Sequence, residues 1–297
     1  MQPLLERVRR GERLLGDGAW GTMLLERGLP PGAPPESLNL SRPELIEEVG
    51  HLYVEAGADL LTTNTFGGSP LRLALHSLED ETEPINRGAV LAARRAAAGR
   101  AYVSASVGPT GRLLAPLGDV SPEEVRAGFE RQIRALAEAG ADLVCVETMS
   151  DLAEAVLAIE AARGVAPGLP VLATMTFDRT PRGYFTVMGV SVERAARGLA
   201  EAGADVVGSN CGNGSEAMIE IAAAFRKATS LPLAIQPNAG LPREREGRLV
   251  YPEEPEFMAG KAGALLELGV SIIGGCCGTT PGHIRALRQR VDAQARA

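Results

Sequence analysis

The chain has 297 residues, of which 45% are hydrophobic and 23% charged, and its formal net charge at pH 7 is −7. This composition is typical of a soluble globular protein with a large core. The acidic balance and the lack of a lysine- or arginine-rich block argue against a nucleic-acid-binding surface. No apolar run approaches the roughly 18 residues of a membrane span, and the amino-terminal segment has no apolar signal-peptide core. We therefore expect a cytoplasmic protein.

A short phrase recurs along the chain. EAGAD begins at Glu55, Glu138 and Glu201, and a looser ELGVS begins at Glu267. In each copy a helix end is followed by a glycine, which suits the left-handed residue of a helix C-cap. The apolar run after each glycine is continuous, as in a strand of a parallel sheet covered on both faces. The repeat predicts successive helix–turn–strand units of a parallel α/β fold.

Eight such strands are predicted in chain order, with alanine-rich helical stretches such as Pro122–Ala139 and Asp151–Arg163 between most of them. Eight β/α units in about 300 residues are typical of a single (β/α)8 TIM barrel, which we predict for residues 1–297. A doubly wound open sheet is the alternative, but the first strand ends in GDGAWGT and not in the G-x-G-x-x-G signature. The predicted strands are Leu14–Ala19, Leu60–Phe66, Tyr102–Val107, Leu143–Thr148, Val171–Phe177, Val206–Asn210, Leu233–Asn238 and Ser271–Gly275.

Two longer connections interrupt this rhythm, the proline-rich Leu29–Pro43 and the charged Gly240–Pro255. Both begin at or near the side of the barrel where the strands end. They are candidate walls or lids of an active site, with ordinary surface loops as an equal alternative.

Three cysteines follow predicted strands, Cys211 in GSNCGN and the adjacent pair Cys276 and Cys277 in GGCCGT. Four cysteines in the whole chain are too few for a disulfide scaffold, which favours metal binding or catalysis. The sixth and eighth strands of a barrel flank the seventh, so three thiolates from their carboxyl ends can share one ion. Three sulfur ligands leave a fourth tetrahedral position open, as in a catalytic zinc site. Asn238, which ends the seventh strand, is the candidate weak fourth ligand, and burial of the cysteines as small hydrophobic residues is the alternative.

A zinc ion surrounded by thiolates favours attack by sulfur on an alkyl group, because zinc holds a bound thiol as its thiolate. A zinc hydrolase would need histidine or carboxylate ligands, and His51, His76 and His283 all fall in predicted helices, so we interpret them as structural. Asp17 and Glu147 end strands, and buried carboxylates need partners such as a substrate amino group. A turn role for Asp17 is the alternative. The pattern predicts a pocket for an amino acid that carries a thiol.

The motifs GDGAWGTML, TTNTFGG, VETM, GSNC and above all GGCCGTTPGHIRAL resemble those of the homocysteine S-methyltransferase family, in order from about Asp17 to His283. The resemblance implies a (β/α)8 barrel in which zinc is held by Cys211, Cys276 and Cys277. It also implies that homocysteine binds zinc through its sulfur, with its amino and carboxyl groups held by Asp17, Gly18, Thr63 and Glu147.

Members of this family differ in methyl donor. GGCCGTTP and TNTFGG are most similar to the homocysteine-binding module of cobalamin-dependent methionine synthase, which implies methylcobalamin on a separate partner protein as donor. Members that use S-methylmethionine commonly carry an arginine where this chain has Gly278, and betaine-dependent members carry a tyrosine where it has Gly67. Trp20 replaces the usual methionine, so direct transfer from S-methylmethionine or betaine, or a different thiol acceptor, remains the alternative. Because the matched motifs reach nearly to its end, we expect no folate, cobalamin or activation module in this chain.

Two other classes of function fit the sequence less well. A Schiff-base aldolase barrel needs a lysine at a strand end, whereas Lys227 and Lys261 fall in predicted helices. A zinc- or redox-sensing module would not need Asp17 and Glu147 beside an open metal position. The sequence therefore favours a zinc-dependent thiol methyltransferase.

Overall fold

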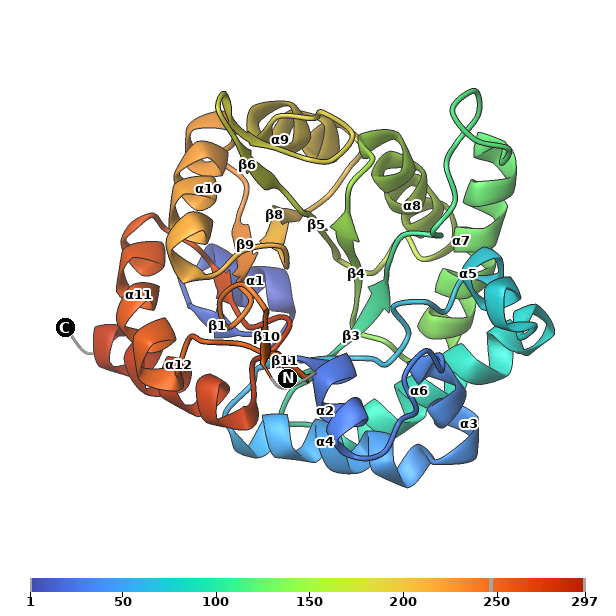
Figure 1. The fold of residues 1–297 in the computed structure, drawn as a ribbon, viewed down its shortest axis with the longest axis horizontal. Coiled ribbons are helices and arrows are strands. Elements are labelled where there is room, and N and C mark those ends of the chain that lie inside the picture. The colour runs from blue at the N-terminus through green and yellow to red at the C-terminus, as the bar shows by residue number, and fades with distance from the viewer. Residues whose placement is uncertain (1, 246–247, 296–297) are drawn as a thin grey trace.

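Eight parallel strands close into a barrel in the computed structural model, which describes residues 2–245 and 248–295 (Figure 1). They hydrogen-bond in the order β1, β12, β9, β8, β5, β4, β3, β2, and a parallel bridge between Gly16 and Leu60 joins β2 back to β1. The predicted (β/α)8 architecture is confirmed. The strands are β1 Leu14–Leu15, β2 Leu60–Thr62, β3 Tyr102–Val107, β4 Leu143–Met149, β5 Val171–Met175, β8 Val206–Asn210, β9 Leu233–Gln236 and β12 Ile272–Ile273.

Several predicted strands are too long at their carboxyl ends. The first was expected to reach Ala19, but β1 ends at Leu15 and a helix begins at Trp20. The second was expected to reach Phe66, but the N–H of Thr65 donates to the carbonyl of Thr63 at 2.8 Å and turns the chain out of the sheet. The residues after β1 and β2 consequently form loops above the barrel, where such folds build their active sites.

Helices surround the sheet on its outer side (Figure 1). Ser121 and Ser191 precede two of them, and each hydroxyl accepts a backbone N–H from the first turn, as an N-cap does. The helices are α1 Leu4–Arg9, α2 Trp20–Glu26, α3 Leu38–Ser41, α4 Pro43–Glu55, α5 Pro70–Leu73, α6 Thr82–Ala97, α7 Pro122–Glu138, α8 Leu152–Val165, α9 Val192–Glu201, α10 Ser215–Ala228, α11 Pro255–Glu267 and α12 Pro281–Ala295, with short 3-10 turns η1 Pro35–Ser37, η2 Ala74–His76 and η3 Glu79–Glu81.

The recurring EAGAD phrase has one structural role at the amino ends of the strands. Its aspartate accepts a backbone N–H from the neighbouring strand and pairs with an arginine of a neighbouring helix. The three sets, called here the Arg–Asp pairs, are Asp59 with Leu15 N (2.9 Å) and Arg288 (2.9 Å), Asp142 with Val103 N (2.7 Å) and Arg94 (2.8 Å), and Asp205 with Val171 N (2.8 Å) and Arg163 (2.6 Å). Each aspartate of the repeat thus links two neighbouring strands at their amino ends.

The fourth copy departs from this rule, because ELGVS places Ser271 where the others have aspartate. Arg226 of α10 donates to backbone carbonyls there, one of them Leu231 O at 2.8 Å. Burial lowers the pKa of Arg226, as expected for a guanidinium that has no carboxylate partner among the described residues.

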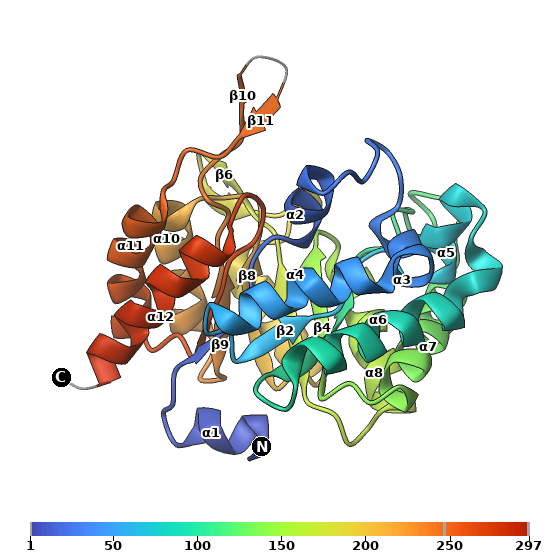
Figure 2. The same cartoon turned by 90° about the horizontal axis from the view of Figure 1, so that it is seen from below.

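The amino end of the barrel is closed by α1, which lies beneath the strands in Figure 2. Leu4 and Val8 of α1 pack on inward-facing strand residues such as Leu60 and Tyr102. Cys145 is buried in the same lower layer.

The carboxyl end carries the longer connections. Two antiparallel ribbons lie there, β6 Asp178–Thr180 with β7 Gly183–Phe185 and β10 Arg243–Arg245 with β11 Arg248–Val250. The β10–β11 ribbon projects well beyond the strands (Figure 2). None of the helices in the described ranges combines the length and apolarity needed to cross a bilayer.

Candidate active site

Three cysteines meet at the carboxyl end of the barrel. Cys211 follows β8, and Cys276 and Cys277 follow β12, the two strands that flank β9. Their sulfur atoms all lie within 4.8 Å of one another, and the Sγ atoms of Cys211 and Cys277 are 3.7 Å apart. The predicted convergence of these thiols is confirmed.

The backbone at both cysteine loops is specialised. Cys211 has φ 61°, a left-handed conformation that costs a non-glycine residue about 1–3 kcal/mol and marks a constrained site. Its N–H donates to Gln236 O at 3.1 Å, which holds the loop to β9. On the other loop, a Cβ at Gly275 would lie 2.3 Å from Oγ1 of Thr279, so only glycine lets the chain turn before the cysteine pair.

The three thiols cannot all ionise by themselves. Hydrogen bonds with Cys211 and Cys276 lower the pKa of Cys277 to about 3. For Cys211, the bond with Cys276 lowers the pKa, but the bond with Cys277 and burial together raise it to about 11. The bonds with Cys211 and Cys277, with burial, raise the pKa of Cys276. Negative charge on one sulfur disfavours ionisation of its neighbours, and a bound cation would remove that penalty. Three soft sulfur donors fit a divalent zinc-like ion.

Asp17 lies in the loop after β1 and is buried, with 2% of its surface exposed. Its carboxylate accepts bonds from Thr62 N (2.7 Å), Thr62 Oγ1 (2.8 Å) and Trp20 Nε1 (2.9 Å). Burial raises its pKa to about 6, against the lowering effect of these bonds. The carboxylate is therefore already well occupied: it fixes the indole of Trp20 and the end of β2, and it adds negative charge to the site.

Glu147 lies near the end of β4 and has a freer carboxylate. Its Oε1 accepts a bond from the Ser106 hydroxyl, while among the described residues its Oε2 has only a long hydrogen bond of 3.3 Å from Asn210 Nδ2. Burial raises the pKa of Glu147 to about 7; the bond from Ser106 lowers it and the charge of Asp17 raises it further. A carboxylate with one loosely held oxygen suits a cationic ligand group.

Gly18 and Thr63 also line the cavity, but in different ways. A Cβ at Gly18 would come within 2.7 Å of Thr279 Oγ1 and 2.9 Å of the Tyr53 ring, so the backbone approaches its neighbours closely there. The Thr63 hydroxyl lies 2.6 Å from Thr65 Oγ1 and accepts Ser106 N at 3.1 Å. It is thus engaged within the protein, whereas Thr62, which the sequence did not single out, bonds to Asp17.

Asn238 is buried beside the cysteine loops, and its N–H donates to Asn213 O at 2.9 Å. Within the described ranges its Oδ1 accepts no hydrogen bond. A buried carbonyl oxygen without a donor is suited to a ligand or an ion, and its assignment as fourth ligand stays a prediction.

One cavity of about 600 Å³ joins the three cysteines with Asp17, Gly18, Thr63 and Glu147, whereas Asn238 is not among its lining residues in the ranges that the structure describes. The predicted wall Leu29–Pro43 contributes Gly32 to Glu36, whereas Gly240–Pro255 contributes none of the lining residues within the described part of the chain. His76 also lines the cavity, although the sequence interpretation made it structural. The lining residues that bear on function are Asp17, Gly18, Trp20, Glu36, Thr62, Thr63, Phe66, Arg72, His76, Ser106, Glu147, Cys211, Cys276 and Cys277.

Three converging cysteines beside one buried and one partly buried carboxylate, at the carboxyl end of a parallel eight-stranded sheet, define an α/β barrel with a site suited to thiol chemistry. The chain belongs to the homocysteine S-methyltransferase family, whose model matches residues 14–291.

Two curated relatives are methionine synthases. The chain is 33% identical to that of Mycobacterium leprae (strain TN), over 98% of this chain and 25% of the relative. It is 32% identical to that of Mycobacterium tuberculosis (strain ATCC 25618 / H37Rv), over 94% of this chain and 24% of the relative. The chain thus spans about a quarter of the length of these relatives.

Among solved structures, the chain is similar to the homocysteine methyltransferase MmuM from Escherichia coli in its metallated form, with a TM-score of 0.81 and 27% identity. That match covers 97% of this chain and 100% of the other. The apo form of the same protein matches with a TM-score of 0.74 and 26% identity.

Proposed function

We propose that this barrel transfers a methyl group to the thiol of homocysteine and forms methionine, with zinc held by Cys211, Cys276 and Cys277. The observation that carries the proposal is the convergence of these three cysteines and Glu147 on one cavity. Zinc in such a site would keep the substrate sulfur ionised and nucleophilic at neutral pH.

The residues around the cysteines can orient an amino acid. The loosely held Oε2 of Glu147 accepts a bond from the substrate ammonium group, and the substrate in turn stabilises the ionised form of this carboxylate. Asp17 adds negative charge nearby and holds Trp20 as a wall of the cavity. In the described chain the N–H of Gly18 donates to no protein acceptor, so it is available to the substrate carboxylate.

For the donor we propose methylcobalamin delivered by a separate protein module. The support is the length of the methionine synthase relatives, which are about four times as long as the segment this chain matches. The cavity is also larger than one small amino acid occupies, which leaves room for a second reactant above the sulfur.

Glu36 favours a second candidate, a sulfonium or quaternary ammonium donor. This carboxylate is 5% exposed, and its Oε1 accepts Gly67 N at 2.6 Å. No ion pair to Glu36 occurs among the residues that the structure covers, and Trp20 and Phe66 line the same cavity. A buried carboxylate with aromatic neighbours is a suitable site for an onium cation.

The test supplies zinc-loaded protein and homocysteine with methylcobalamin, S-methylmethionine or betaine and measures methionine. Methylcobalamin turnover, with demethylation seen by absorbance, supports the first donor. Turnover with an onium donor alone, lowered in Glu36→Gln and unchanged in the exposed control Glu44→Gln, supports the second. Absence of methionine with every donor would refute the proposed function.

A further inference from the structure

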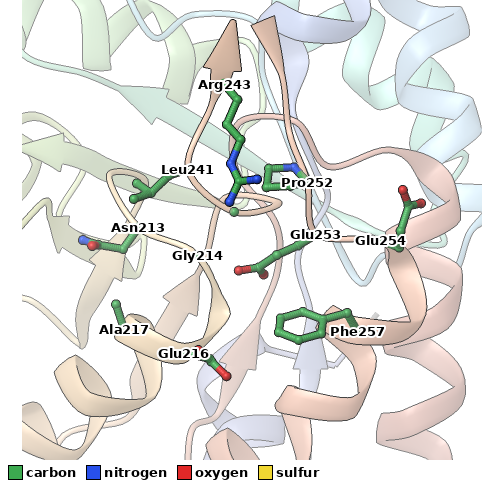
Figure 3. A pocket seen from close by; sticks show the side chains of 11 residues that line it. Asn213, Gly214, Glu216, Ala217, Leu241, Arg243, Pro252, Glu253, Glu254 and Phe257 are labelled. Atoms are coloured by element: carbon green, nitrogen blue, oxygen red, sulfur yellow. The ribbon is translucent and has the colours of Figure 1, made fainter. Parts of the chain in front are cut away.

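A three-residue segment, Tyr251–Glu253, crosses behind the cysteine loops and contacts both of them. It follows the β10–β11 ribbon and precedes α11. With the start of α10 it borders a second hollow of about 530 Å³, separate from the thiol cavity (Figure 3). The segment belongs to the connection Gly240–Pro255, which the sequence marked as a candidate wall or lid, but no single residue of it was predicted to have a role, because the loop has no periodic pattern.

The side chain of Glu253 holds the loop that carries Cys211. Figure 3 shows it reaching from its own loop toward Gly214. Its carboxylate accepts Ser215 Oγ at 2.6 Å and Ser215 N at 3.1 and 3.2 Å. A Cβ at Gly214 would lie 2.2 Å from Oε1 of Glu253. The carboxylate therefore caps α10 four residues after Cys211 and satisfies a helix N-terminal N–H.

The main chain of Glu253 is tied to the other cysteine loop. Its N–H donates to Ala239 O at 2.9 Å, and Ala239 N donates in turn to Cys277 O at 3.0 Å. Its carbonyl lies 2.8 Å from Nε2 of His283. Because the N–H of Thr280 donates to Nδ1 of His283 at 3.1 Å, the ring proton must be on Nε2, so His283 donates to Glu253.

We infer that Glu253 is a positioning residue of the thiolate centre, which sets the separation of Cys211 from Cys276 and Cys277. Its carboxylate fixes one ligand loop, and its backbone fixes the other through Ala239 and His283. The inference depends on the proposed zinc site. Groups that orient metal ligands contribute to metal affinity without touching the ion, and their loss typically costs 10–100-fold.

The experiment measures zinc affinity by competition with a chromophoric chelator for the parent chain, Glu253→Ala, Glu253→Gln and the exposed neighbour Glu254→Ala. We expect Glu253→Ala to bind zinc about 10–100-fold more weakly. Glu253→Gln keeps an oxygen for Ser215 and should fall between Glu253→Ala and the parent. Glu254→Ala should match the parent.

Cobalt substitution reports on the geometry of the metal site itself, which would not change if Glu253 only stabilised the fold. In Glu253→Ala the sulfur-to-cobalt charge-transfer bands should shift or weaken, at a temperature where its circular dichroism equals that of the parent. Zinc affinity and cobalt spectrum both equal to the parent's would overturn the positioning role alone. A parent chain that binds neither metal would instead overturn the proposed function and this inference with it.

Discussion

The ring of Tyr251 occupies the space into which a side chain at position 278 would project. A Cβ built on Gly278 would lie 2.1 Å from Cγ of Tyr251, and Gly278 itself has φ 78°. Two independent constraints therefore require glycine after the cysteine pair: the left-handed backbone conformation and the aromatic ring that fills the side-chain position. The two residues fix the path of the chain directly after Cys277.

Gly278→Ala is expected to destabilise the protein and weaken zinc binding, since the backbone or the Tyr251 ring must move. Gly11→Ala is the matched control: Gly11 has φ 84° with no atom within 4 Å of its Cβ position, so it should lose only the about 1–2 kcal/mol of left-handed strain. Denaturant unfolding and zinc affinity measure both. The double variant with Tyr251→Ala should recover part of the zinc affinity; equal behaviour of the Gly278 and Gly11 variants would contradict the steric account.

Replacement of Cys211, Cys276 or Cys277 by serine should strip the metal and abolish methyl transfer. The parent is expected to carry about one zinc per chain, because three thiolates and one exchangeable ligand complete a tetrahedron. Cys145→Ala is the control, since this thiol lies in the lower core and should leave metal content unchanged. Elemental analysis after dialysis measures the stoichiometry, and full occupancy in all three serine variants would rule out the ligand assignment.

Glu147→Gln should weaken homocysteine binding and leave zinc in place. The pKa of Glu147 is raised to about 7, so the carboxylate is mostly protonated below that pH and ionised above it. Its attraction for the ammonium group should therefore grow as pH rises through about 7, and the glutamine variant should lack this increment. Calorimetric titrations from pH 6 to 8 measure it, with Glu154→Gln, a buried carboxylate bonded to Thr110, as control.

The Arg–Asp pairs should contribute to stability and not to chemistry. Asp205→Ala removes the acceptor for Val171 N and for Arg163 and leaves a partly buried guanidinium unpaired. We expect a loss of about 1–3 kcal/mol in the free energy of unfolding, with unchanged zinc affinity. Asp178→Ala, on the exposed ribbon strand β6, should cost little, and a drop in zinc affinity on Asp205→Ala would contradict a purely structural role.

The parts of the site that follow from chain topology could be predicted from sequence. Parallel strands in a barrel all end on one rim, so cysteines after the sixth and eighth strands had to meet. The same reasoning brought Asp17 and Glu147 to one cavity, and both line it. Continuous apolar runs were enough to place every strand, although not to end it. After β2, for example, Thr63 and Thr65 are β-branched like strand residues, yet the chain turns away there.

The contacts between distant side chains could not be predicted. That Thr62 and not Thr63 bonds to Asp17 depends on which face of β2 each side chain occupies. Glu253 reaches Ser215 across 38 residues of sequence, and neither sits in a periodic pattern. The position of His283 was a usable signal that this histidine supports the cysteine loop. The motif GGCCGTTPGH keeps it at a fixed distance in sequence from the cysteine pair, and the structure shows it hydrogen-bonded to Glu253.

Ser271 replaces the aspartate in the fourth copy of the repeat. Within the described ranges, β9 and β12 therefore lack the Arg–Asp pair that links the other strands at their amino ends. These are also the strands whose upper ends carry or border the thiols. An ion shared by Cys211 and Cys277 would join β8 to β12 across β9 from the top. Amide protons of β9 and β12 should then exchange with solvent fastest among the barrel strands in metal-free protein, and slow the most when zinc is added. The bound ion would thus also stabilise the side of the barrel formed by β9 and β12. Loss of the metal would then weaken the fold as well as remove activity.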